Sequence, residues 1–272
     1  MTTIYMTLTR FAVMSGAYGN LPALEACITD SEEQQCRVRF FLGNAIGAFG
    51  NSDAVLDIIR NNFEITLAGN LEQEAALGSD GGEFGFTDPE DVEYSRRGFR
   101  YALESLGDVN RTWLGSWPEK VVLVLPRGRV LFVHGSPERS NEFLFESELD
   151  EERLLRWMDE ERVFGLICDH TGLPWVRALP GGRFAANVGA VGLPANDGDP
   201  AAHYAIVDLL DLDRPVEIRR VEYPHDHWAD RVEADGVDPA FTEPLRTGFW
   251  RIGVASLPEA ERRAAEARRT SS

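Results

Sequence analysis

The chain has 272 residues, of which 43% are hydrophobic, so it can bury a large core in one domain or in two small ones. Its 45 acidic and 27 basic residues give a formal net charge of -18, which repels polyanions and excludes duplex nucleic acid as an expected partner. Small phosphorylated ligands are not excluded, because a local pocket of backbone N–H groups can favour an anion despite the overall charge.

The cysteine content predicts a cytoplasmic protein, and the hydropathy of the chain predicts that it does not span a membrane. Cys27, Cys36 and Cys168 are odd in number and have no C-x-x-C spacing, so neither a disulfide framework nor a thiolate zinc site is indicated. The first residues show no secretory-signal pattern, and no apolar stretch is long enough to span a bilayer.

The first half of the chain predicts three strand-to-helix units. Strands are expected over residues 10–15, 37–42 and 63–68, with helices from 21 to 28 and from Ser52 or Asp53 through Ile59. Such units favour parallel strands with a ligand site at their carboxyl ends. The segment 74–91 is rich in Gly and acidic residues, and it predicts an exposed or mobile loop over that edge.

The second half predicts more strands. A helix over 94–106 and a turn between Trp113 and Trp117 precede a β-hairpin that delivers His134 at its end. The remaining predicted elements are the hairpin strands 120–125 and 129–133, a helix over 150–157, and strands over 163–168, 184–188, 203–209 and 216–223. We expect a single domain over residues 1–250 and a C-terminal helical or disordered tail over 251–272.

Six short motifs follow in order along this framework. They are Ser15-Gly16-Ala17-Tyr18-Gly19-Asn20-Leu21-Pro22-Ala23-Leu24-Glu25, Leu42-Gly43-Asn44, Gly69-Asn70-Leu71-Glu72, His134-Gly135-Ser136-Pro137, Asp169-His170-Thr171-Gly172 and Asn187-Val188-Gly189-Ala190-Val191-Gly192-Leu193-Pro194. Their order resembles the YfcE-like bacterial branch of the calcineurin-like metallophosphoesterases, over roughly residues 10 to 223. The resemblance implies an α/β fold, a four-layer α-β-β-α sandwich of two mixed β-sheets.

The sequence departs from the family where two divalent ions would be bound. The resemblance places Gly16 at the first Asp, Tyr18 at the adjacent His, Asn44 at the bridging Asp, Gly172 at the final His, and Leu71 at the His that assists phosphate binding and leaving-group protonation. Two nearby dications need anionic ligands, and these substitutions remove them.

We therefore predict a protein that has lost the two-metal centre, a non-hydrolytic binding or regulatory pseudoenzyme with no cofactor. No catalytic residue is assigned, and a small-molecule or phosphate-like ligand is expected. The candidate pocket residues are Gly16, Tyr18, Asn20, Asn44, Asn70, Leu71, Glu72, His134, Asp169, His170 and Gly172.

Other readings stay open. Asn70, His134 and His170 survive from the family pattern and could hold one divalent ion (Mn, Fe or Zn), with Glu72, Asp169 or water completing the shell. The same loops could form an enzyme with a repurposed metal-free pocket, or the two histidines could serve only as hydrogen-bonded residues of a strand end and a turn.

Two further possibilities concern surfaces. The chain could be a homo-oligomer or the subunit of a protein complex. His225 and His227 would lie on one face of a strand and could bind a transition metal, although the lack of a third ligand nearby favours a surface role.

Overall fold

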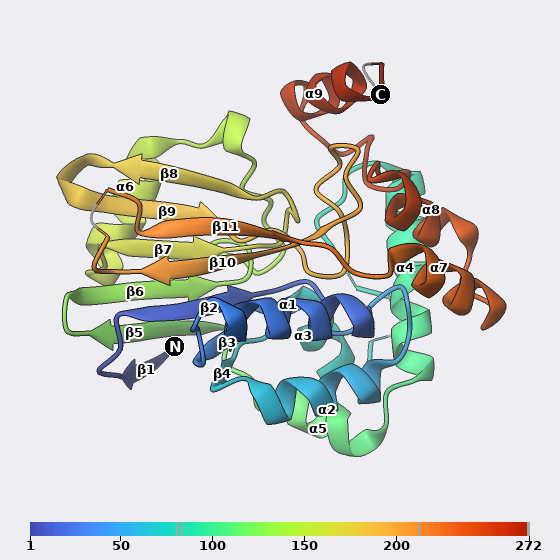
Figure 1. Ribbon diagram of the computed structural model, residues 1–272, viewed down its shortest axis with the longest axis horizontal. Coiled ribbons are helices and arrows are strands. Elements are labelled where there is room, and N and C mark those ends of the chain that lie inside the picture. Colours follow the sequence, from blue (N-terminus) through green and yellow to red (C-terminus); the bar gives the residue numbers. More distant parts are fainter. Residues whose placement is uncertain (80, 83, 212, 271–272) are drawn as a thin grey trace.

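The computed structural model describes residues 1–79, 81–82, 84–211 and 213–270, and the strands within them form two mixed sheets (Figure 1). The six-stranded sheet has the order β1 (Thr2–Tyr5), β5 (Lys120–Leu125), β6 (Gly128–Val133), β7 (Gly165–Cys168), β9 (Arg183–Asn187), β8 (Trp175–Leu179). The five-stranded sheet has the order β11 (Val216–Val221), β10 (Ala202–Asp208), β2 (Arg10–Met14), β3 (Arg39–Phe41), β4 (Ile65–Thr66). Strands β2, β3 and β4 are parallel, as the strand-to-helix units predict.

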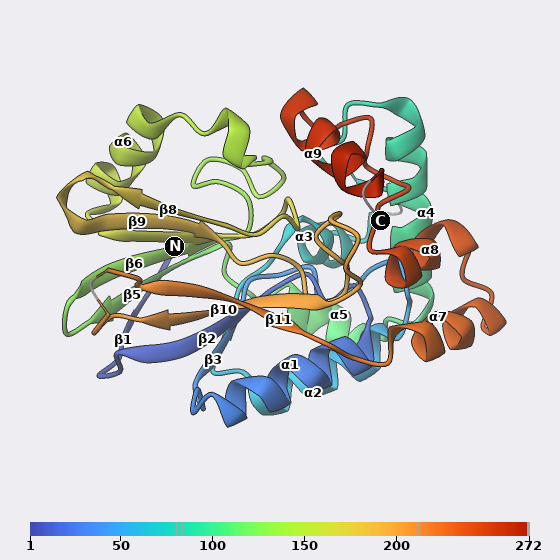
Figure 2. The ribbon, with the colours of Figure 1, turned by 45° about the horizontal axis from the view of Figure 1, so that its top comes forward.

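Helices cover the outer faces of both sheets and also pack beside one end of the strands. They are α1 (Leu21–Glu33), α2 (Ser52–Asn62), α3 (Asn70–Ala76), α4 (Pro89–Glu104), α5 (Asp108–Leu114), α6 (Glu151–Glu161), α7 (His225–Ala234), α8 (Pro239–Thr247) and α9 (Glu259–Arg269). Figure 2 shows α6 on one side of the paired sheets and α1 and α2 on the other. This confirms the predicted four-layer α-β-β-α sandwich.

Alternating apolar residues of the strands fill the space between the sheets. Phe11 of β2 and Phe40 of β3 have ring centroids 5.0 Å apart, and Phe132 of β6 in the other sheet lies 5.6 Å from Phe40. All three side chains are almost fully buried, so the two sheets share one core.

Helix α1 is fixed at both ends by specific polar contacts. Asn20 caps it by accepting a hydrogen bond from the Ala23 N–H at 3.3 Å. In its third turn, Asp30 accepts hydrogen bonds from Arg219 at 3.0 Å and from the Tyr204 hydroxyl at 2.6 Å. Burial raises the pKa of Asp30, but the bonds from Arg219 and Tyr204 outweigh it and hold that pKa below its usual range.

The sequence prediction misses several elements and is wrong on one. Strands β1 and β8 and helices α5, α7 and α8 were not predicted, and His225 and His227 begin a helix rather than lie on a strand. Positions two apart on a helix point in different directions, so the two imidazoles do not face one site. In the described residues, no group of three His, Cys, Asp or Glu side chains is placed to hold a metal ion.

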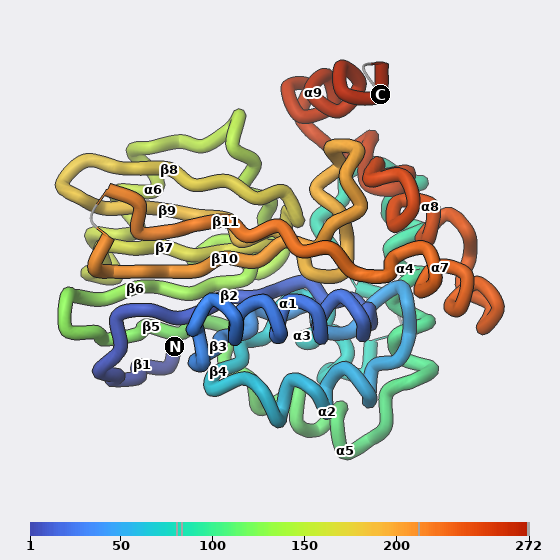
Figure 3. Tube along the Cα trace, viewed as in Figure 1, coloured from blue at the N-terminus to red at the C-terminus, as the bar shows by residue number. Residues whose placement is uncertain are grey.

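The C-terminal region packs at the end of the sandwich where the site lies. Figure 3 shows the chain leaving β11 and running to α7 and α8 beside α4. Residues Glu259–Arg269 within the tail form α9, and Glu261 on this helix accepts a hydrogen bond from the Ser147 hydroxyl at 2.6 Å. Part of the predicted 74–91 loop (residues 80 and 83) and of the 251–272 tail (271–272) lies outside the described residues. Within the described ranges, no helix combines the length and hydropathy needed to cross a membrane.

Candidate functional site

The predicted motif loops meet at the carboxyl ends of the strands. Gly16, Tyr18, Asn44 and His170 all have positive φ angles, of 61°, 51°, 54° and 55°. Backbone hydrogen bonds join the loops: Gly16 N–H donates to Gly43 O at 2.9 Å and Tyr18 N–H to Asn44 O at 3.0 Å. A positive φ is costly for a bulky residue such as Tyr, so the surrounding contacts must hold this backbone shape.

His134 and His170 are buried and contact each other. His134 Nδ1 lies 2.7 Å from the Leu42 carbonyl oxygen, to which it donates, and its Nε2 lies 3.2 Å from His170 Nδ1. Burial lowers the pKa of His134 to about 4, and burial together with the charge of His134 lowers that of His170 well below its usual range. Both imidazoles are therefore neutral at pH 7.

Glu72, considered above as a metal ligand, instead holds the backbone of two loops. Its Oε2 accepts hydrogen bonds from the N–H groups of Asn44 at 2.7 Å and Gly69 at 2.9 Å, and its Oε1 accepts one from Ala45 at 2.9 Å. Burial raises the pKa of this fully buried carboxyl, against the opposing effect of the backbone N–H groups. Its oxygens are thus used within the scaffold.

The two amides differ in their hydrogen bonding. Asn44 Oδ1 accepts a hydrogen bond from the Leu71 N–H at 3.3 Å. Asn70 is 4% exposed, and its Oδ1 has no hydrogen-bond partner in the part of the chain that the structure describes. A buried acceptor without a partner is costly, so the Asn70 carbonyl oxygen is an unsatisfied polar atom of a residue that lines the cavity described below.

Asp169 occupies space that a side chain at position 16 would need. Its Oδ2 lies 3.2 Å from where a Cβ on Gly16 would stand, and Tyr18 Cε2 lies 3.0 Å from the same point. Burial raises the pKa of Asp169 to about 7, against the opposing effect of the Ser15 hydroxyl. A carboxyl thus lies beside residue 16, where the resemblance places an Asp, but it comes from a different loop.

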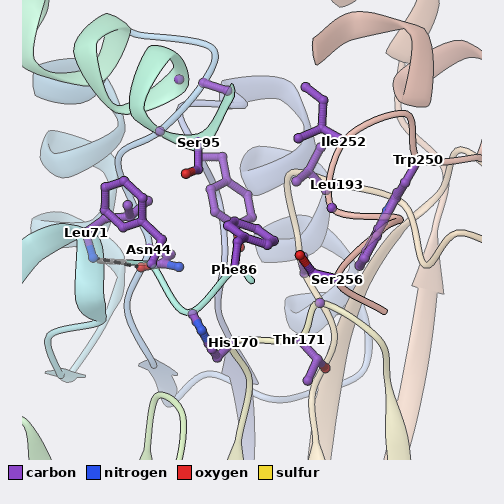
Figure 4. A pocket seen from close by; sticks show the side chains of 18 of the residues that line it. Asn44, Leu71, Phe86, Ser95, His170, Thr171, Leu193, Trp250, Ile252 and Ser256 are labelled. Carbon is purple, nitrogen blue, oxygen red and sulfur yellow. Dashed lines mark hydrogen bonds between the residues drawn. The ribbon is translucent and has the colours of Figure 1, made fainter. Parts of the chain in front are cut away.

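An apolar cavity of about 170 Å³ lies beside these loops. Figure 4 shows Asn44 and Leu71 on one side of it, Trp250 and Ile252 on the opposite side, and His170 between them. Its aromatic walls include Tyr18, Phe84, Phe86, Phe99, Phe143 and Trp250. Phe143 stacks on the His170 ring with centroids 4.2 Å apart, so aromatic surface covers the imidazole.

The segment 249–257, called here the C-terminal wall, lies opposite Asn44 and Leu71 along the cavity (Figure 4). It contributes Trp250, Ile252 and Leu257 to the lining. Asp91 of α4 holds it by accepting hydrogen bonds from Gly253 N–H at 2.7 Å and from Ser256 N–H at 3.1 Å.

The donors present do not fit two divalent ions. Gly16 and Gly172 offer no side chain, the Asn44 amide is neutral and already bonded, and Glu72 is engaged with backbone N–H groups. Among the described residues, no three His, Cys, Asp or Glu side chains lie together so that they could hold an ion, and two dications need several anionic ligands.

Comparison with known proteins agrees with this architecture. No model of a known protein family matches the chain. An uncharacterized protein of Methanocaldococcus jannaschii is 24% identical over 238 residues, which is 80% of this chain and 89% of the relative. Two solved structures superpose along most of their length: a hypothetical protein of Pyrococcus horikoshii (TM-score 0.74, 20% identity, 89% of this chain, 100% of that one) and a metallophosphoesterase of Sphaerobacter thermophilus (0.68, 23%, 88%, 99%).

The chain has the calcineurin-like metallophosphoesterase fold. Within this metallophosphoesterase fold, six of the predicted pocket residues line the cavity: Tyr18, Asn44, Asn70, Leu71, His170 and Gly172. The other five, Gly16, Asn20, Glu72, His134 and Asp169, are not among the residues that line it. Asn20 caps α1 and donates to Gly192 O at 3.1 Å, which is a structural role.

Sequence reasoning missed most of the apolar lining. Phe84 and Phe86 fall in the segment predicted as an exposed or mobile loop, yet Phe84 is only 5% exposed. Trp250 and Ile252 lie far along the chain from every motif. Aromatic residues inside a Gly-rich acidic segment are the one signal that could have indicated a covering wall.

Proposed function

We propose that this metallophosphoesterase-fold protein is a non-hydrolytic binding protein whose ligand occupies the apolar cavity. The observation that supports this most is the replacement of metal-binding side chains by hydrocarbon and aromatic surface at the carboxyl ends of the strands. Leu71 stands where the resemblance places a histidine, and it lines the cavity with Tyr18 and Phe143. Apolar concave sites with few polar groups are typical of small-molecule pockets.

A phosphate ester is a poor match for this cavity. None of the described residues that line the cavity is Lys or Arg. His170 also lines it, and its imidazole is neutral at pH 7. A phosphate dianion would lose its hydration there without gaining a cation.

The test combines metal analysis with activity screens. Protein purified with Mn²⁺ or Zn²⁺ is expected to hold fewer than two ions per chain and to show no phosphatase or phosphodiesterase activity that depends on His134, with His134→Ala as control. Two tightly held ions per chain, or turnover that His134→Ala abolishes, would reject the proposal.

One observation favours a second function, a phosphoesterase with a single metal ion. His134 Nε2 and His170 Nδ1 face each other at 3.2 Å, and His134 fixes its other nitrogen on a backbone carbonyl, as metal-ligating histidines do. Asn70 could supply the third donor. A bound Mn, Fe or Zn ion would supply Lewis acidity. In a calorimetric titration with Zn²⁺, one binding site per chain that the His170→Ala variant lacks would support this second function. The absence of Zn²⁺ binding to the wild type would dismiss it.

We also propose a cytoplasmic location, which fits three buried free thiols, and a homo-oligomer or protein complex as the working state. Light scattering on the purified protein tests the homo-oligomer. A monomer at all concentrations would exclude the homo-oligomer and leave a complex with another protein as the proposed working state.

A further inference from the structure

The size of the cavity limits what can occupy it. Its volume is about 170 Å³. An engineered apolar cavity of about 150 Å³ is known to hold benzene. One aromatic ring, or a fused pair as small as indole, is therefore the size of molecule that this cavity admits.

The walls offer little hydrogen bonding. Three polar side chains at the surface of the cavity are already bonded within the protein: Ser95 donates to Val92 O at 2.8 Å, Trp250 Nε1 to Pro194 O at 2.7 Å, and Ser256 to Asp91 at 2.9 Å. A charged ligand would lose its hydration against these walls and find no counter-charge among the described lining residues.

Two buried atoms of the lining residues have no hydrogen-bond partner in the described ranges, Asn70 Oδ1 and His170 Nε2. Asn70 lines the cavity, and its Oδ1 is buried with no partner in the described ranges. An N–H or O–H group on the ligand would satisfy this oxygen, whereas a pure hydrocarbon would leave it unpaired.

We propose that the cavity binds a small uncharged aromatic molecule that carries one hydrogen-bond donor, directed at Asn70 Oδ1. Aromatic walls suit such a molecule because edge and face contacts with Phe and Trp rings add to the gain from burying apolar area. This inference rests on the proposed binding function and names its ligand class.

The experiment compares five probes by calorimetry and ligand-observed NMR on the full chain: phenol, indole, toluene, benzoate and phenyl phosphate. Phenol and indole are expected to bind, and benzoate and phenyl phosphate at least about tenfold more weakly because their charge is not compensated. Equal or tighter binding of the two anions would overturn the ligand class.

One cavity variant and a matched control locate the site. Leu193 lines the cavity, so Leu193→Trp should fill it and abolish binding of all rings. Leu210, which is 73% exposed on the turn after β10, gives the control Leu210→Trp, which should bind as the wild type does. Circular dichroism confirms that both variants fold. Ring binding that survives Leu193→Trp would refute the site.

The Asn70→Leu variant tests the hydrogen bond from the ligand to Asn70 separately from the packing of the ligand in the cavity. The ratio of phenol affinity to toluene affinity should fall about two- to tenfold, the worth of one neutral hydrogen bond. A merely structural role for Asn70 would weaken both probes equally and leave that ratio unchanged, which would contradict the proposal.

Failure of this inference and failure of the proposed function look different. If no ring binds and no hydrolysis is seen, the ligand class is wrong and the binding function stands. If hydrolysis depends on His134, the binding function itself is wrong.

Discussion

Replacing Glu72 by Ala should destabilise the protein more than any exposed substitution. The change leaves three buried backbone donors, those of Asn44, Ala45 and Gly69, without their acceptor. Each unpaired buried group costs about 1–3 kcal/mol, so the loss of partners for three donors should lower the free energy of unfolding by about 3–9 kcal/mol. That is a large part of the roughly 5–15 kcal/mol that stabilises a typical domain.

Urea unfolding at pH 7, followed by circular dichroism, measures this change. Glu72→Gln keeps one accepting oxygen and should lose about half as much stability. Glu25→Ala, an exposed position on α1, is the matched control and should change stability by less than about 0.5 kcal/mol. A loss below about 1 kcal/mol for Glu72→Ala would refute the assignment of its carboxylate to the backbone.

Three further predictions concern other parts of the chain. Asp30→Asn should lower the free energy of unfolding by about 1–2 kcal/mol at pH 7. Because the pKa of Asp30 is lowered in the folded protein, the extra stability of the wild type should be present above the unfolded-state pKa of about 3.9 and lost as the pH falls through the folded-state pKa. Urea unfolding of both proteins at a series of pH values measures this difference. Gly192→Ala would place a Cβ 2.0 Å from the Ala17 carbonyl oxygen, so its melting temperature should fall clearly, and an unchanged value would contradict the close approach of the two loops. Asp91→Ala should raise hydrogen exchange in the C-terminal wall while β2 and β10 keep their protection.

Local patterns in the sequence predict the sandwich well. The short apolar runs that become β2, β3 and β6 are each bounded by turn residues, so their identity depends mainly on nearby residues. The order of the motif loops then places the site at the carboxyl ends of the strands. Both predictions concern features that a few adjacent residues determine.

The remaining features depend on contacts between distant residues. Helix α8 contains Pro244, which obscures its helical pattern, and it is stabilised by packing on α4 and α7. The cavity joins Phe84 to Trp250 across more than half of the chain. The role of Glu72 also cannot be predicted from the sequence, because the sequence does not distinguish a carboxylate that accepts hydrogen bonds from backbone N–H groups from one that binds a metal ion.

The position of Asp169 limits which side chains fit at residue 16. An Asp introduced at residue 16 would start from a Cβ already 3.2 Å from the Asp169 carboxyl and 3.0 Å from the Tyr18 ring, and would add a second negative charge in a buried site. An Asp at residue 16 would therefore require these neighbours to shift by a few tenths of an ångström. The backbone φ of 61° at this position also favours glycine, so sterics, charge and backbone geometry all disfavour a second carboxylate here.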